Sequence, residues 1–204
     1  IYLQQILQYS PTMTGVADVP FTLVLIVVAG VLANKIARFN PKAILVIAPL
    51  VVAAGLVYFS RIPVQANYWT DILPGIVLMA AGMAAVFVTT TMVTTSGVSH
   101  EESGLVSGLL NAGQQIGGAI GLAVLSVVST SITKHELLTA QGNPAAMQIA
   151  VVHGFQRGFL VASLFAVGAA VVALVVLKVH KPTKADITQE AETEAEALAA
   201  VPGV

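Results

Sequence analysis

Three carboxamide side chains occur close together in a long stretch of the chain that carries no charge. Asn111, Gln114 and Gln115 lie within residues 104–129, GLVSGLLNAGQQIGGAIGLAVLSVVS. At about 100° per residue, a helix places the three amides on one arc, together with Gly104, Ser107 and Gly118 and, further along, Leu122. An amide donates and accepts hydrogen bonds without carrying charge. These residues are therefore candidates for holding polar groups or water in an apolar setting.

Glycines occupy another face of the same expected helix. Gly113, Gly117 and Gly121 recur at every fourth position, a small-xxx-small pattern that lets a second helix approach closely. The sequence therefore predicts helix packing on this face and polar contacts on the amide arc.

Two interpretations of the amide arc remain open. A buried amide without a partner costs on the order of 2–7 kcal/mol, so each amide must meet a polar neighbour or water. The amides could bond to adjacent helices, at about 0.6 kcal/mol each, or they could line a water-accessible pathway. Three amides on one arc favour the pathway, to which Thr22 in an earlier apolar stretch is a further candidate contributor.

One carboxylic acid is placed where it could take up and release a proton. The apolar stretch that ends at Lys35 is too short to cross a bilayer unless its helix begins before Asp18, near residues 12–15. Acids within membrane spans are rare and usually functional, which makes Asp18 the candidate proton-coupling residue. The alternative is that Asp18 lies at headgroup depth, where the helix dipole stabilises its charge.

The composition indicates an integral membrane protein. Of 204 residues, 56% are hydrophobic and 9% are charged, against about 25% charged in a soluble domain. The net charge of −1 offers no basic face for nucleic acid. The chain has no cysteine, and its four histidines are scattered, so we expect no metal, no cofactor and no enzymatic site. Because the first residue is Ile1 and not methionine, we expect the chain to lack an N-terminal portion.

The apolar runs predict an all-α fold with five transmembrane helices, at about residues 14–36, 43–60, 71–95, 102–130 and 156–178. Residues 1–11 are interpreted as the tail of a truncated helix followed by an extracellular loop. Residues 12–180 form the membrane bundle, with a polar loop from Lys134 to Arg157. Residues 181–204 are expected to be a cytoplasmic tail, either disordered or a solvated helix.

Local signals refine these elements. Ser99 to Glu102 resembles a capping box at the start of the fourth helix. The threonines between residues 89 and 95 are expected to bond back to carbonyls of their own helix. The second and fifth spans are almost wholly apolar and could face lipid all round, whereas the first and fourth carry polar side chains.

The cations predict the orientation. Six lie on one side of the expected spans (Lys35, Arg38, Lys42, Lys178, Lys181 and Lys184) and three on the other (Arg61, Lys134 and Arg157). Cytoplasmic loops carry the excess of Lys and Arg, so the six-cation side and the C-terminus are expected to be cytoplasmic.

From Ile1 to about Leu177 the chain resembles the C-terminal half of a major facilitator superfamily transporter. It is most similar to the fourteen-span drug:proton antiporter family of multidrug exporters. The resemblance is carried by LQQILQYSPTMTGVADVP, then GVLANKIARF, then GLVSGLLNAGQQIGGAIGLAVLS. Residues 30–38 resemble the cytoplasmic gating signature of that family, with Asn34 at the position of its acid.

The resemblance implies a six-helix bundle, its first helix truncated, that works with a missing N-terminal half. It implies a proton-coupled exporter of small amphipathic drugs, located in the plasma membrane and specifically in a bacterial inner membrane. Its expected partners are lipid, protons and substrate. Gly30, Asn34, Lys35 and Arg38 would act at the cytoplasmic gate, and one bundle alone would not transport. Two alternatives remain: an exporter of an endogenous metabolite or siderophore, and a non-transporting membrane scaffold.

Overall fold

The computed structural model describes residues 4, 9–35, 40–96, 98, 102–139 and 143–177, which are helical apart from short connections and contain no strand. The helices are α2 (Pro11–Ala17), α3 (Val19–Lys35), α4 (Pro41–Phe59), η2 (Tyr68–Ile72), α5 (Leu73–Thr95), α6 (Ser103–Thr139) and α7 (Pro144–Val176). Within these ranges, five segments are long and apolar enough to cross a membrane, with α2–α3 and η2–α5 each counting as one. The predicted all-α membrane fold is confirmed.

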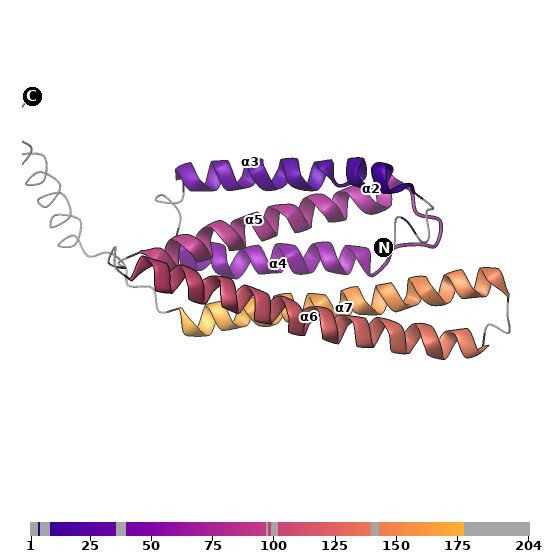
Figure 1. Ribbon diagram of the computed structural model, residues 1–204. Coiled ribbons are helices and arrows are strands. Elements are labelled where there is room, and N and C mark those ends of the chain that lie inside the picture. Colours follow the sequence, from indigo (N-terminus) through magenta and orange to yellow (C-terminus); the bar gives the residue numbers. More distant parts are fainter. Residues whose placement is uncertain are drawn as a thin grey trace, which may run out of the picture.

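The long helices run antiparallel along a common direction (Figure 1). One end of the bundle holds the end of α3, the start of α4 and the end of α7, and is called the Lys42 end below. The opposite end holds α2, the end of α4, η2 and the connection between α6 and α7, and is called the Arg61 end. Successive helices alternate between these ends, as the predicted order of spans requires.

Helices α4 and α5 form the centre of the bundle. α4 packs against α5 and α7, while α3 packs against α5 and α6 against α7. The α4–α5 contact is close because it is built on glycines: a Cβ on Gly82 would lie 2.8 Å from the Ala48 carbonyl oxygen, and one on Gly55 3.2 Å from the Gly75 carbonyl oxygen. The apolar α4 therefore packs against α5 and α7, and the expectation that this span could face lipid all round is wrong.

A hydrophobic cluster joins four elements near the Arg61 end. Its buried members are Phe59, Ile62, Ile72, Ile76 and Val152. The rings of Phe59 in α4 and Phe159 in α7 lie 5.4 Å apart between centroids. The cluster is closed by the Gln156 side chain, whose amide nitrogen donates a 2.8 Å hydrogen bond to the carbonyl of Ile62. The connection after α4 is thus held against α7.

The predicted polar loop from Lys134 to Arg157 is wrong. α6 continues to Thr139, and α7 begins at Pro144, where the Asn143 side chain caps it by accepting a 3.0 Å hydrogen bond from the Ala145 amide. The two helices have 37 and 33 residues, about 55 and 50 Å at 1.5 Å per residue. Their hairpin projects beyond the other helices at the Arg61 end (Figure 1). Charged residues mark where a helix leaves the membrane, not where it ends.

A polar contact between the side chains of α6 and α7 supports this projecting hairpin. His153 Nδ1 of α7 lies 2.8 Å from Glu136 Oε2 of α6. The hydroxyl of Thr133 also donates a hydrogen bond to the Ala150 carbonyl, at 3.4 Å. Polar contacts thus continue the α6–α7 packing past the apolar part of both helices.

Two further sets of expectations concern the threonines of α5 and the residues that the structure does not describe. The hydroxyls of Thr91, Thr94 and Thr95 bond to carbonyls of their own helix, at 2.7–2.9 Å, which confirms the prediction for these three. The prediction is wrong for Thr89, whose buried hydroxyl has no hydrogen-bond partner in the described structure. Most of residues 1–8, most of the expected capping box at residues 99–102, Arg38 and the tail at 181–204 lie outside the described residues.

Candidate functional site

The amide arc of α6 is uncovered. The side chains of Asn111, Gln114 and Gln115 are all exposed, and within the described part of the chain no hydrogen bond joins any of them to another helix. By helical geometry the same face continues into Leu125, Ser129 and Ile132, where Leu125 and Ser129 lie against Gly154 and Gly158 of α7. The amide arc is therefore the open continuation of the face by which α6 contacts α7.

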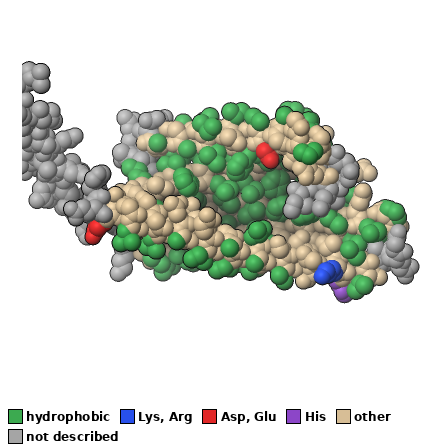
Figure 2. All heavy atoms as spheres, in the orientation of Figure 1, with side chains coloured by type: hydrophobic (Ala, Val, Ile, Leu, Met, Phe, Trp, Pro, Cys, Tyr) green, Lys and Arg blue, Asp and Glu red, His purple; other side chains and the backbone are tan. Residues whose placement is uncertain are grey.

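The two helices that carry polar side chains stand at the margins of the bundle. α3 packs against α5, and α6 mainly against α7. Figure 2 shows the face between α3 and α6 hollowed, with hydrophobic side chains on its floor. Of the five candidate spans, those of α2–α3 and α6 are the least buried, at 6% and 0% of their apolar windows. This face has no cover from the described helices.

Asp18 lies at a break between α2 and α3. Pro20 cannot donate a backbone hydrogen bond, and its ring crowds the carbonyl four residues earlier, so the helix is interrupted at Asp18 (φ −89°, ψ −7°). The Asp18 amide shares the carbonyls of Thr14 and Gly15, at 3.1 and 3.2 Å. Its side chain is exposed and belongs to no ion pair found among the described residues. The sequence predicted a helix that begins near residues 12–15 and passes through Asp18, and the structure has one candidate span from Pro11 to Ala33. The one-residue break at Asp18 was not predicted.

The depth of Asp18 follows from the start of α2. Ser10 caps this helix, its hydroxyl accepting a 3.2 Å hydrogen bond from the Met13 amide, and Pro11 is its first residue. Asp18 is then about 10 Å along the helix axis from that start. Thr22, one turn further on the same side, is also exposed.

Tyr68 forms a hydrogen bond to the backbone next to the break at Asp18. Its phenol oxygen donates a 2.6 Å hydrogen bond to the carbonyl of Ala17, the residue before Asp18. The bond joins residues 51 positions apart, and no local pattern in the sequence signals it.

The remaining predicted positions are only partly described. Gly30 is exposed in α3, with no atom within 4 Å of where a Cβ would lie. Asn34 and Lys35 form the last turn of α3. Gly113, Gly117 and Gly121 likewise have no atom within 4 Å of a Cβ position. No described helix packs on these three glycines, so their packing role stays a prediction.

The glycines that do mediate contact with α6 belong to α7. A Cβ on Gly154 would lie 2.7 Å from the Ser129 carbonyl oxygen and closer still to the Thr133 hydroxyl. Ala150, Gly154 and Gly158 repeat every four residues, the same small-xxx-small pattern. Because the sequence analysis assigned residues 134–157 to a loop, it did not recognise this small-xxx-small pattern as a helix contact.

The chain matches known proteins over most of its length. Residues 1–202 match the family described as Major Facilitator Superfamily. The chain is 36% identical over 170 residues to the puromycin resistance protein of Streptomyces alboniger, an alignment that covers 82% of this chain and 33% of that protein. It is 37% identical over 130 residues to the tetracenomycin C resistance and export protein of Streptomyces glaucescens (64% and 24%). It is 33% identical over 146 residues to the cephamycin export protein of Amycolatopsis lactamdurans (71% and 29%).

These matches cover about a third or less of each relative's length. They confirm the resemblance to drug and antibiotic exporters that the sequence predicted. With the helical membrane fold and the match over residues 1–202, they establish that the chain belongs to the Major Facilitator Superfamily.

Proposed function

We propose that the complete protein containing this chain exports small amphipathic molecules across the plasma membrane, by alternating access and at the expense of a proton gradient. The named relatives are resistance and export proteins for puromycin, tetracenomycin C and cephamycin. Alternating access needs a second bundle that rocks against this one around a central site. The hollowed face between α3 and α6 is the surface that this second bundle would cover (Figure 2).

The observation that carries the proposal is the uncovered amide arc on α6. Asn111, Gln114 and Gln115 offer donors and acceptors but no charge, and their side chains are exposed. A ligand site of this kind is mostly apolar with a few polar groups that orient the ligand. Such a surface accommodates amphipathic substrates without demanding one fixed charge pattern. Thr22 would contribute from the α3 side.

Asp18 is the proposed proton carrier within this bundle. Its position at a helix break, exposed and about 10 Å inside the start of α2, lets it meet water in one state and protein in another. Protonation would neutralise the only acid in residues 11–35. Removing that charge changes the cost of covering this segment by apolar surface, which couples proton binding to bundle movement.

The orientation is also part of the proposal. The Lys42 end would face the cytoplasm, with Gly30, Asn34, Lys35 and Arg38 at a gate between the bundles. The C-terminus would then be cytoplasmic.

Transport by the complete protein in inside-out membrane vesicles tests the proposal. We expect accumulation of a fluorescent amphipathic dye such as ethidium when the vesicle interior is acidified, and its release when nigericin collapses the pH gradient. The variant Asp18→Asn should lose the pH-driven component, while Glu102→Gln, an exposed acid at the other end of the bundle, should keep it. Dye movement that ignores the pH gradient would remove the antiport mechanism, and no movement of any amphipathic dye would remove the exporter assignment.

A further inference from the structure

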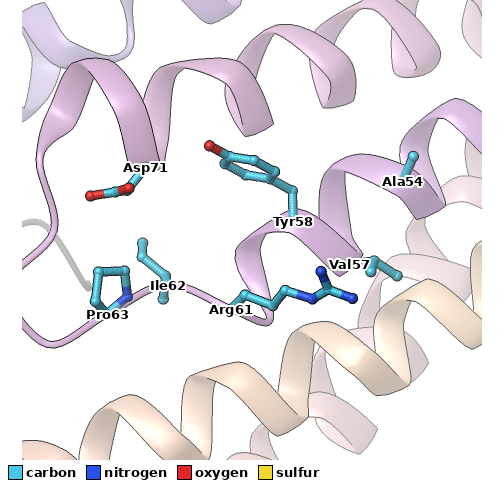
Figure 3. Close-up of a pocket in the computed structure, with 7 residues that line it drawn as sticks. All are labelled: Ala54, Val57, Tyr58, Arg61, Ile62, Pro63 and Asp71. Atoms are coloured by element: carbon cyan, nitrogen blue, oxygen red, sulfur yellow. The ribbon is translucent and has the colours of Figure 1, made fainter.

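A pocket with both a cation and an anion lies at the Arg61 end, away from the amide arc. It has a volume of about 340 Å³ and is formed where α4 ends and η2 begins. Its polar groups come from Tyr58, Arg61 and Asp71, and apolar side chains including Ala54, Val57 and Pro63 complete it (Figure 3). The function proposed above does not use this pocket.

The charged groups stand apart in the pocket. Figure 3 shows Arg61 and Asp71 on opposite sides, with the ring of Tyr58 above the gap between them. In the described part of the chain, Arg61 belongs to no ion pair. One carboxylate oxygen of Asp71 accepts a 2.7 Å hydrogen bond from the Asn67 amide, which leaves its other oxygen for a ligand. The Tyr58 hydroxyl is held by the carbonyl of Thr70.

The pocket sits at the membrane interface on the outside of the bundle. Arg61 lies two residues after the end of α4, and Trp69 in η2 is 71% exposed, as is typical of interfacial tryptophans. From the pocket, Ala54, Leu50 and Ile47 form an exposed apolar stripe along α4. The stripe lies opposite Leu45, Ala48 and Leu56, which are buried against α5 and α7. No other described helix covers it.

We propose that this pocket binds the headgroup of a phospholipid that carries a phosphate and a primary ammonium. The guanidinium of Arg61 matches the geometry of a phosphate, and the free oxygen of Asp71 accepts a hydrogen bond from the ammonium. Asp71 disfavours a headgroup whose charge is only negative. A quaternary ammonium has no N–H to donate, so it would bind less well.

The stripe below the pocket fits the acyl part of the same molecule. From Ile47 to its end at Phe59, two residues before Arg61, α4 rises about 18 Å, more than half of a hydrocarbon core about 30 Å thick. A lipid with its headgroup between Arg61 and Asp71 can therefore lay one chain along Ala54, Leu50 and Ile47. This continuity with exposed apolar surface favours a lipid over a soluble molecule with the same headgroup.

The test measures the thermal stability of the complete protein in detergent during titration with lipids. Phosphatidylethanolamine should raise the melting temperature at about tenfold lower concentration than phosphatidylcholine or phosphatidylglycerol. Soluble phosphoethanolamine should have no comparable effect; an equal effect would show that the ligand is not a lipid and overturn the assignment.

The variants Arg61→Gln and Asp71→Asn should remove this preference. The carboxamide introduced by Asp71→Asn retains an oxygen that can accept the hydrogen bond from the Asn67 amide, so the local fold is kept. Arg61→Lys should restore part of the preference through its charge. Lys134→Gln, which removes an exposed cation at the same end, serves as the control and should behave as the parent protein. Equal stabilisation by all three lipids, or a preference that survives in both variants, would overturn the proposal.

Discussion

The phenol of Tyr68 donates a 2.6 Å hydrogen bond to the carbonyl of Ala17, directly before Asp18. This bond connects η2, at the start of the α5 span, to the break between α2 and α3. Pro20 creates the break, and Tyr68 fixes one of the backbone groups beside it. The only acid of residues 11–35 thus lies at the break between α2 and α3, next to a backbone carbonyl that Tyr68 holds.

Removing this anchor should weaken the bundle measurably. We expect Tyr68→Phe to lower the free energy of unfolding by about 0.5–1.5 kcal/mol, the net contribution of one hydrogen bond. Thermal unfolding of the complete protein in detergent measures the change. Trp69→Phe is the control, because Trp69 is 71% exposed and carries no such bond in the described structure. Equal melting temperatures for Tyr68→Phe and the parent would show that the bond contributes nothing.

The glycines of the bundle should differ sharply in tolerance to alanine. A Cβ on Gly82 meets Val52 Cγ2 at 2.6 Å and the Ala48 carbonyl oxygen at 2.8 Å, so α4 and α5 must separate to admit it. We expect Gly82→Ala to cost about 1–3 kcal/mol of stability. In the same detergent assay, Gly113→Ala should cause little loss, because its Cβ position is open in the described chain.

The Gly113→Ala variant of the complete protein could instead show a large loss of stability. Such a loss would show that a segment outside the described residues packs on this face of α6, as the small-xxx-small pattern predicted. A Gly82→Ala protein as stable as the parent would contradict the close α4–α5 packing.

The bond between Gln156 and Ile62 should matter more than an exposed glutamine on the same helix. Gln156→Leu leaves the Ile62 carbonyl without its partner next to the hydrophobic cluster, and an unsatisfied buried group costs about 1–3 kcal/mol. Gln148→Leu changes an exposed side chain of α7 and should be nearly neutral. Denaturation midpoints compare the two, and a difference of zero or the reverse order would contradict the assigned contact.

The amide arc should influence which substrates are exported. Asn111→Leu and Gln115→Leu remove the polar groups but keep similar side-chain size, so we expect changes of several-fold in export of some substrates and little change in protein level. A panel of amphipathic dyes and antibiotics in cells that express the complete protein provides the measurement. Ile116→Leu alters a neighbouring exposed position and should leave the panel unchanged. If all variants export every substrate in the panel as the parent protein does, these amides have only a structural role.

The number and order of the membrane spans could be predicted from the sequence, since each span is a long apolar run between charged residues. The polarity of the runs also separated α3 and α6 from the others, and these two are the least buried spans. The threonine bonds in α5 followed from a local rule. All these features depend on neighbours in sequence.

What could not be predicted depends on contacts between distant residues or on helix outside the membrane. Residues 134–157 contain charges, so a membrane criterion ended α6 too early, although the Glu136–His153 pair and the Asn143 cap support helix there. The roles of Gly55, Gly75 and Gly82 depend on the register between α4 and α5. The bond from Tyr68 to Ala17 depends on where η2 is placed against α2.

The central claim, that the amide arc of α6 borders a water-filled pathway, is tested most directly by chemical labelling. Single cysteines at positions 111, 114 and 115 of the complete protein, in a background without other cysteines, would be treated with a water-soluble maleimide. A cysteine in place of Val152, which is 1% exposed in the hydrophobic cluster, provides the unreactive control. We predict rapid labelling at the three amide positions, slowed several-fold by a transported drug. Labelling as slow as at position 152, with and without drug, would contradict the account.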